Sequence, residues 1–403
     1  MKKWLAAVGL AAAFAGAAGA WRPAAWAYHD YPWAYDAASG DWYWFNPDEQ
    51  WVVNMDNGQW ARLPNSAVAS GWNYYDWGYV YAQGNGAWHW INDADAQWVA
   101  NMRTAAWSRY GAAEVPAGMA LVPAGEFTMG DAFAEGSTNE LPAHAVDVGA
   151  FCMDATEVTW GQWTEVRAWA TNHGYAITDA GGKATNHPAH SVRWNEAAKW
   201  CNARSEKEGL TPCYYANAAQ TNVFRAGTND MGNAQVKWDA NGYRLPTEAE
   251  WEKAARGGAA GMRFPWGDTN AIQHARANYR SSVGYAYDVS PTRGYHPDYV
   301  DGSNPFLYTS PAGAFAPNGY GLYDMAGNVK EWCWDRFSET YYVETPAADP
   351  QGPSTGTTRV VRDGSWGSTG YAAGVRCAAR GGSLPTVSSL HLGFRCVRRV
   401  EGL

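Results

Sequence analysis

The stretch GYGLYDMAGNVKEW, residues 319–332, decides the fold of the larger part of this chain. Its glycines indicate a tight loop, which carries Asp324, Gly327, Val329 and Glu331. Hard oxygen ligands presented by a glycine turn suit calcium. The alternative is that Asp324 and Asn328 only form the turn, and that Glu331 pairs with an arginine.

Three helices are predicted upstream of this stretch. Capping boxes start the first helix at Thr159 with Gln162, and the third at Thr247 with Glu250. Asn195 is predicted to cap the helix between them. The glycines expected to stop the second and third helices are Gly209 and Gly257. The buried face of the first helix is predicted to hold Trp163, Val166, Trp169 and Ala170.

Six further blocks flank the opening stretch in a fixed order. They are GMALVPAGEFTMGD (118–131), HAVDVGAFCMDATEVTWGQW (144–163), YRLPTEAEWEKAARGG (243–258), FPWGD (264–268), RVVRDGSW (359–366) and LGFRCVR (392–398). Together the seven blocks resemble the sulfatase-modifying-factor family, whose founding activity is the formylglycine-generating enzyme. The resemblance covers about 280 of the 403 residues. It implies an α+β, C-type-lectin-like domain over residues 118–400, irregular and loop-rich.

The founding chemistry of the family requires a pair of cysteines, because two thiolates form a natural Cu(I) site. The resemblance places these cysteines just after the turn at 363–366, on Ser368 and Ala373. A hydroxyl and a methyl group do not bind Cu(I), so copper is not expected. Ser365 matches the serine of the family's pocket, whereas Lys330 stands where the enzymes have tryptophan. We therefore do not expect an active formylglycine-generating oxidase.

The resemblance also implies two calcium sites. The first consists of the loop residues Asp324, Gly327, Val329 and Glu331. The second corresponds to Asn278, Tyr279, Asn304 and Phe306, with Asn304 in place of the aspartate of the enzymes. The missing charge should lower affinity at the second site. Calcium is the one cofactor expected.

Six cysteines, an even number, favour disulfides in an exported protein. The resemblance maps the disulfide that crosses the family's domain onto Cys201 and Cys396. It puts Ala255 where the usual partner of Cys377 stands. Three further cysteines have no assigned partner: Cys152, Cys213 and Cys333. Buried free thiols are the alternative for each of them.

The segment 367–393 has an unusual composition, since it contains no Asp, Glu, Lys, Asn or Gln. In a C-type-lectin-like fold this segment belongs to the ligand-binding surface. Small residues could form an adaptable recognition surface there together with Tyr371, Arg376, Arg380 and His391. Target proteins of diversity-generating retroelements share the fold and vary this region. Ordinary family members without catalytic activity also carry small residues here.

Residues 28–110 differ in texture and form a second predicted module. They hold 11 of the 25 tryptophans, and they repeat in two copies of about 46 residues. GDWYW (40–44) and QWVVNM (50–55) return as GAWHW (86–90) and QWVANM (97–102). Short aromatic runs between turn residues predict β-hairpins that share a core. The alternative is that some indoles bind sugars or cell-wall polymers, and both can hold for different residues. Residues 111–117 are read as a linker.

The first 27 residues indicate a signal peptide, because two lysines precede a short apolar segment and A-x-A cleavage candidates. No segment reaches the length of a membrane span. The net charge of −9 without a basic run argues against nucleic acid as a partner. These features predict a secreted, periplasmic or cell-surface bacterial protein.

The sequence thus predicts an exported protein whose larger domain serves in binding or surface organisation, with an unknown protein or glycan as its ligand. The alternative is an oxidoreductase or maturation enzyme that acts on a protein substrate in the same pocket. Ser365, Arg376 and the loop after Trp366 would line that pocket.

Overall fold

The structure is a computed structural model that describes ten strands between residues 26 and 109, and then residues 115–178, 180–300 and 308–400. The predicted signal peptide 1–27 lies outside the described residues except for Trp26 and Ala27, and so does 111–114 of the predicted linker. The contacts divide the chain into two units, Met1–Glu114 with Glu401–Leu403, and Val115–Val400. Each unit is described by itself.

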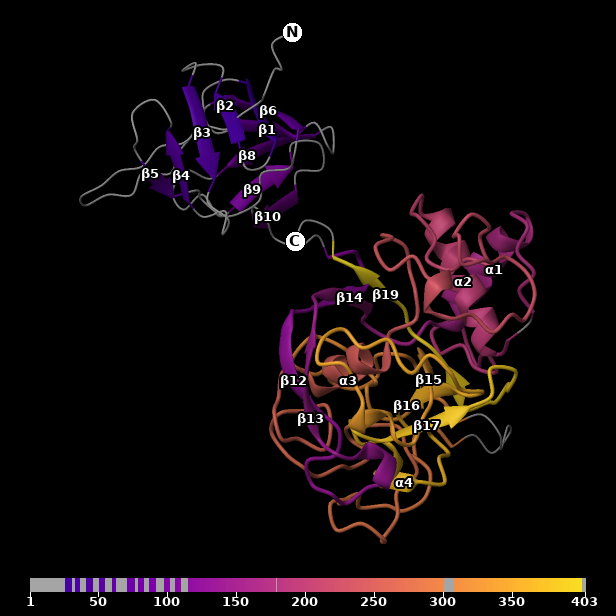
Figure 1. Cartoon of the computed structure of the whole chain (residues 1–403). Coiled ribbons are helices and arrows are strands. Elements are labelled where there is room, and N and C mark those ends of the chain that lie inside the picture. The colour runs from indigo at the N-terminus through magenta and orange to yellow at the C-terminus, as the bar shows by residue number, and fades with distance from the viewer. Residues whose placement is uncertain are drawn as a thin grey trace. The chain divides into compact units, whose positions relative to one another are not determined.

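The first unit contains one antiparallel sheet of ten short strands, which Figure 1 draws in indigo and violet. The strands are β1 (Trp26–Asp30), β2 (Trp33–Asp36), β3 (Asp41–Phe45), β4 (Trp51–Asn54), β5 (Trp60–Arg62), β6 (Gly71–Asp76), β7 (Tyr79–Ala82), β8 (Ala87–Ile91), β9 (Trp98–Asn101) and β10 (Ala106–Arg109). Two consecutive meanders, β1–β5 and β6–β10, join where β1 pairs with β6. The aromatic runs therefore form strands, as their flanking turn residues predict.

The second unit is a loop-rich α+β domain with three small sheets, as the fold class predicts. Its strands are β11 (Met119–Val122), β12 (Gly125–Met129), β13 (His144–Val148), β14 (Phe151–Asp154), β15 (Lys330–Arg336), β16 (Arg359–Arg362), β17 (Arg380–Ser383), β18 (Leu392–Gly393) and β19 (Val397–Arg399). The sheet orders are β11-β14-β19, β12-β13 and β17-β16-β15-β18. β15 therefore lies inside its sheet, and the loop that precedes it is held at the centre of the domain.

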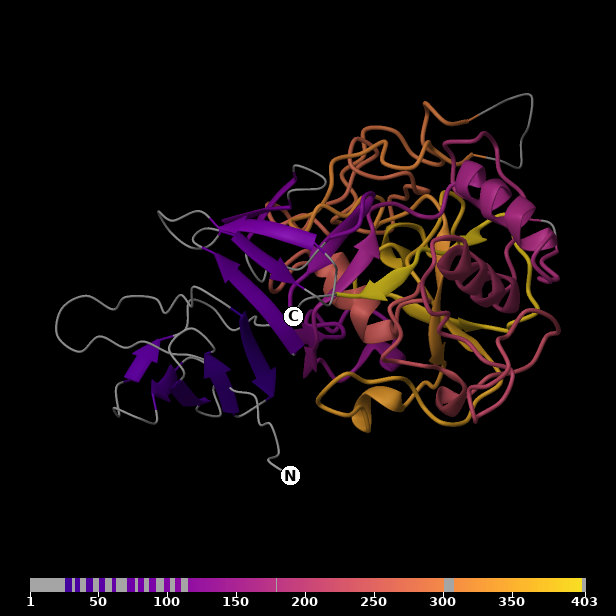
Figure 2. The ribbon, with the colours of Figure 1, turned by 90° about the horizontal axis from the view of Figure 1, so that it is seen from above.

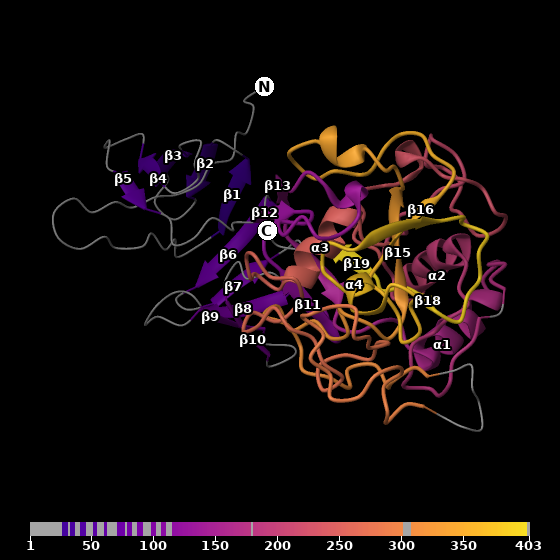
Figure 3. The ribbon, with the colours of Figure 1, turned by 90° about the horizontal axis from the view of Figure 1, so that it is seen from below.

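The helices of this unit are few and mostly short. They are α1 (Trp160–Thr171), α2 (Trp194–Lys207), α3 (Glu248–Arg256), the one-turn α4 (Tyr371–Gly374), and the 3₁₀ turns η1 (Thr138–Glu140), η2 (Asn233–Gln235) and η3 (Tyr341–Val343). Figures 1 and 2 show α1 and α2 side by side at the edge of the unit, whereas Figure 3 shows α3 beside β15 and β19 in its interior. No helix within the described ranges combines the length and the apolar character that a membrane crossing needs.

Two of the three predicted helix starts are confirmed and one is wrong. The capping boxes at Thr159 and Thr247 are both formed. α2, however, starts at Trp194 with Arg193 in the cap position, so Asn195 lies inside the helix. A tertiary contact takes the place of a local cap, because the Trp194 backbone N–H donates to the Pro385 carbonyl at 3.1 Å. The Trp194 indole N–H also donates to the Cys333 carbonyl at 2.8 Å. On α1, Trp169 is only half-buried, whereas the other residues of the predicted face are buried.

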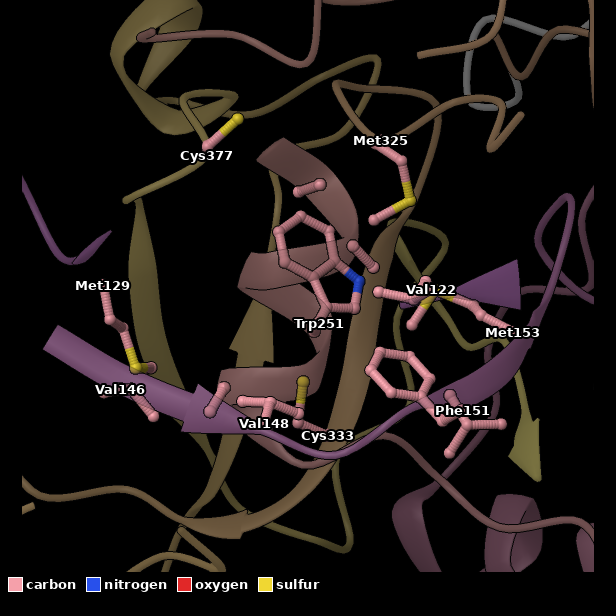
Figure 4. Packing of buried hydrophobic residues seen from close by; sticks show 14 of the residues in the cluster. Val122, Met129, Val146, Val148, Phe151, Met153, Trp251, Met325, Cys333 and Cys377 are labelled. Atoms are coloured by element: carbon pink, nitrogen blue, oxygen red, sulfur yellow. The ribbon is translucent and has the colours of Figure 1, made fainter. Parts of the chain in front are cut away.

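The main core of the second unit is built around Trp251 on α3, which is fully buried. Figure 4 shows its indole surrounded by aliphatic and sulfur-containing side chains from several strands and loops. Among them are Val122, Val148, Phe151, Met153, Met325 and Cys333. Large fully buried aromatic side chains supply much of the burial that short strands cannot provide.

Candidate functional site

Two loops meet at the centre of the second unit. One is the turn 324–329 before β15, and the other is the turn 363–368 after β16. The Asp363 carboxylate joins them, because it accepts the Gly327 N–H at 2.7 and 2.9 Å and the Gly364 N–H at 2.6 Å. The Trp366 N–H donates to the Asn328 carbonyl at 2.9 Å. The two sequence blocks thus form a single rigid structure.

The serines of this structure form a compact hydroxyl cluster with a histidine. The Ser365 N–H donates to Ser368 Oγ at 2.7 Å, and the two hydroxyl oxygens are 3.1 Å apart. Ser365 Oγ also lies 3.2 Å from His391 Nδ1. The Ser368 hydroxyl therefore accepts a bond that closes the turn, which is a structural task.

The donor set at the positions expected for copper contains no sulfur. Ser368 is buried, and Ala373 is half-buried on α4. Cys377, the next cysteine along the chain, belongs to the main core, and burial raises the pKa of its thiol to about 12. A hydroxyl and a methyl group do not supply the soft ligands that Cu(I) prefers, so these residues do not fit copper. The described part of the chain holds no group of three or more His, Cys, Asp or Glu residues arranged to hold a metal ion.

Two histidines stand beside the hydroxyl cluster in neutral form. Burial, followed by the positive charge of Lys330, lowers the pKa of His391. Burial and the neighbouring His391 lower the pKa of His190 to about 4. The His391 ring packs against Trp366 with centroids 4.3 Å apart. A neutral imidazole can accept a proton from the Ser365 hydroxyl, so the Ser365–His391 pair is suited to proton transfer.

At the predicted calcium loop, Glu331 is already paired. Its buried carboxylate accepts bonds from the Arg395 guanidinium at 2.8–2.9 Å and from the Trp251 indole N–H at 2.8 Å. Asp324 and Asn328 have φ values of 54° and 63°, typical of turn-forming residues. The arginine-pair alternative therefore describes Glu331 in this structure, and Val329 is fully buried beside it.

Another carboxyl group at this loop, Glu157, is fully buried. Its oxygens accept no hydrogen bond from an N–H donor of the described residues, and its side chain faces the Asp324 carboxyl group, with which it can share a proton. Burial and the adjacent Asp324 raise the pKa of Glu157 well above its ordinary range. Burial also raises the pKa of Asp324 to about 6, while its Oδ2 accepts the Gly313 N–H at 2.5 Å. Two adjacent buried carboxyl groups suit a hard cation or a proton, so Glu157 and Asp324 fit calcium better than Glu331 does.

Two residues of the second predicted calcium site, Asn278 and Tyr279, lie in the described part of the chain. Asn278 Oδ1 is buried without a partner, which suits a cation. The Tyr279 carbonyl, by contrast, is within hydrogen-bond distance of His274 Nε2, at 3.2 Å. Asn304 and Phe306 lie outside the described residues. Asn278 is thus the residue of this set that remains open to a metal.

The six cysteines are buried thiols in the structure. Cys201 on α2 and Cys396 before β19 face each other with their sulfurs 3.6 Å apart. This approach is longer than an S–S bond but puts both thiols within reach of oxidation to a disulfide. The pair that the resemblance selects is thus brought together by the fold.

The four residues proposed for a ligand surface have different environments. Arg376 is buried and bonds the Glu140 carboxylate at 2.8 and 3.0 Å. The Arg380 side chain has no exposed surface and bonds Glu248 at 2.6 and 2.7 Å. These two arginines hold the fold together and do not face a ligand. Tyr371 and His391 are half-buried and line the region around Trp366.

The sequence reasoning missed three residues of this region: Glu157, Asp363 and Arg280. Asp363 directly precedes the Gly-Ser-Trp turn, which was a usable signal. Glu157 stands more than 160 residues from Asp324 in the chain, and no local pattern links them. Arg280 lies against the Tyr371 ring, with its guanidinium carbon 5.0 Å from the ring centroid.

Comparison with known proteins finds one family and several similar chains. The model of the Sulfatase-modifying factor enzyme 1-like domain matches residues 104–400. A formylglycine-generating enzyme of Streptomyces coelicolor is 38% identical over 301 residues, which cover 70% of this chain and 90% of that protein. Variable protein 1 of Treponema denticola superimposes with a TM-score of 0.53 at 29% identity, over 70% of this chain and 94% of its own. The structure of CarF gives a TM-score of 0.52 at 25% identity, over 72% and 100%.

Proposed function

The chain belongs to the sulfatase-modifying factor family, and from this premise we propose that it is an exported binding or surface-organising protein rather than a copper oxidase. The observation that carries the proposal is the chemistry at Ser368 and Ala373. The Ser368 hydroxyl closes the turn of Ser365, and no thiolate stands at either position. The pocket is therefore equipped to contact a ligand and lacks the ligands for Cu(I).

The test is an oxidation assay with the purified full chain. A Cys-x-Pro-x-Arg peptide is incubated under air with the protein and copper, and aldehyde formation is measured. We expect no rate above that of free copper. The double variant Ser368→Cys/Ala373→Cys shows whether restoring the sulfurs alone restores copper binding. Aldehyde formation by the unaltered chain above the free-copper rate would overturn the proposal.

The second candidate is an oxidoreductase or maturation enzyme that uses this pocket on a protein substrate. The Ser365–His391 contact of 3.2 Å favours it, because a neutral imidazole beside a hydroxyl is a plausible proton-transfer pair. Metal analysis of protein purified from its own export compartment separates the candidates. A bound redox metal supports the enzyme, whereas titration onto a glycan or protein without turnover supports the binding module.

Three further properties belong to the same proposal. Calcium binds at the 324–331 loop, supported by the buried Glu157 beside Asp324. A disulfide links Cys201 and Cys396, supported by the 3.6 Å approach of their sulfurs. The protein is secreted, periplasmic or on the surface of a bacterium, supported by the N-terminal lysines and apolar segment.

A further inference from the structure

We propose that Arg280 is the anchor of the binding surface and takes a single carboxylate of a peptide partner. The inference rests on the proposed binding function and names the chemistry of the ligand. Its basis is the environment of the Arg280 guanidinium, which lies near two aromatic rings and forms no ion pair with any of the described residues.

Two aromatic rings lie near the guanidinium, one from the loop that carries Tyr295 and one from α4. Its central carbon lies 5.2 Å from the Tyr295 ring centroid and 5.0 Å from that of Tyr371, the first residue of α4. Stacking on aromatic faces favours a fixed orientation of the planar group at little entropic cost. The fork of N–H donors is therefore pre-organised before a ligand arrives.

No ion pair or hydrogen bond engages Arg280 within the described ranges 115–178, 180–300 and 308–400. Its neighbour Arg276 makes the contrast clear, because Arg276 also stacks on an aromatic ring, that of Trp266, but pairs with Asp268 at 2.6 and 2.8 Å. A half-buried guanidinium without an anion keeps its full capacity for a bidentate carboxylate.

Aromatic contacts continue from Tyr295 toward the turn 363–368. Tyr295 contacts Trp366 and Tyr308 with centroid separations of 6.0 and 4.9 Å. Trp366 is 4% exposed, and its indole N–H has no partner among the described residues. Tyr295 and Tyr371 thus offer apolar contact area next to Arg280, whereas Tyr308 and Trp366 are buried beside Tyr295.

The composition favours a protein ligand. Tyrosine, tryptophan and arginine are the residues that dominate the energetics of protein–protein interfaces. The net charge of −9 repels a polyanion over long range, whereas one carboxylate at one arginine needs only a local attraction. We therefore assign the site to an Asp, Glu or C-terminal carboxylate rather than to nucleic acid or a polyanionic glycan.

The experiment uses the full chain and two capped tripeptides, acetyl-Ala-Glu-Ala-amide and its Gln isostere. Saturation-transfer NMR gives the dissociation constants, and the Nε–H resonance of Arg280 in arginine-labelled protein reports contact. We expect millimolar binding of the Glu peptide, a saturable shift of that resonance, and binding about 10- to 100-fold weaker in Arg280→Gln. Arg280→Lys, which keeps the charge without the fork, should fall between these values.

Arg276→Gln is the matched control, because it removes an aromatic-stacked arginine that is already paired, and it should leave binding unchanged. The resonance measurement on the unaltered chain decides the question if Arg280→Gln does not fold. Equal binding of the Gln peptide, or binding of glucuronic acid with none of the Glu peptide, overturns the carboxylate-peptide assignment. Either result leaves the copper-free binding function standing, which the aldehyde assay tests separately.

Discussion

At the scale of single residues, charge balance inside the domain is the distinctive feature. Arg395 is a fully buried cation, and it is bonded to Glu331. Glu157, Asp324 and Asp363 lie close enough to influence one another, and burial raises the pKa of all three. The loop therefore holds more carboxylates than its arginine can neutralise. Protons or a cation must supply the difference.

This excess of buried carboxylates predicts that the free energy of unfolding falls as pH rises. Burial raises the pKa of Asp324 from 3.8 to about 6, so the folded state holds a proton that the unfolded state has released between these values. Its stabilising effect is complete below pH 3.8 and is lost as pH rises through about 6, at about 1.4 kcal/mol per pKa unit. Thermal unfolding from pH 4 to 7 in chelator measures it. Asp324→Asn lacks the titrating group, so its melting temperature minus that of the unaltered chain should increase from pH 4 to pH 7. A difference that stays constant with pH would contradict the raised pKa of Asp324.

Calcium should replace the missing protons above this window. We expect millimolar calcium to raise the melting temperature at pH 7 after chelation, and Asp324→Ala or Glu157→Gln to abolish the rise. Glu165→Gln is the control, because Glu165 is exposed and pairs with Lys207 on the surface. Absence of any calcium shift in the unaltered chain removes calcium from the proposal.

At the scale of elements, a loop residue supplies hydrogen bonds to the last carbonyls of α3. Gly257 ends α3 with a φ of +56°, and the Asn318 side-chain amide donates to the Ala254 and Ala255 carbonyls at 2.7 and 3.2 Å. Asn318, which directly precedes the stretch 319–332, thus caps the C-terminus of α3.

The crowding at Gly257 makes a matched comparison possible. A Cβ there would lie 2.9 Å from Asn318 Cβ and from the Gly319 nitrogen, whereas Gly261, with a φ of +66°, has nothing within 4 Å. Both alanine variants should lose about 1 kcal/mol to left-handed backbone strain. Gly257→Ala should lose at least about 1 kcal/mol more by displacing Asn318. Urea unfolding measures both variants, and equal losses would mean that the Asn318 contact yields without cost.

At the scale of the whole domain, α2 and the last strand meet at Cys201 and Cys396. The two residues are 195 positions apart, and their sulfurs are 3.6 Å apart. Because a cross-link over so long a loop restricts the unfolded chain strongly, its loss should cost up to about 5 kcal/mol. α2, which covers one side of the domain, would be tied to the sheet β11-β14-β19.

Peptide mapping of protein recovered from an oxidising compartment tests this link. We expect a cross-linked peptide that joins Cys201 to Cys396, and a lower melting temperature after reduction. Cys213→Ser serves as the control, because the Cys213 thiol donates to the Gly242 carbonyl at 3.4 Å and is buried. Full alkylation of Cys201 and Cys396 in unreduced, denatured protein would show that the pair stays reduced.

The sequence predicted the elements whose signals are local. The capping boxes at Thr159 and Thr247 and the glycine stop at Gly257 were readable, because a helix end is satisfied by side chains within a few residues. The start of α2 was not readable, because Arg193 makes no side-chain capping bond and the Trp194 N–H is satisfied by the carbonyl of Pro385, which is distant in the sequence. The seven ordered blocks predicted the fold class through their resemblance to the sulfatase-modifying-factor family, and the fold class is confirmed.

The sequence by itself determined the two-part organisation, the loop-rich α+β scaffold and the identity of the residues at 368 and 373. Only the tertiary structure decided which charged residues form ion pairs inside the domain and which have no such pair among the described residues. It buried Arg376 and Arg380 in ion pairs, left Arg280 near two tyrosines without an ion pair among the described residues, and placed Glu157 beside Asp324. The physical reason is that the sequence specifies which side chain stands at each position. The partner of a side chain and its removal from water depend on residues that only folding brings near.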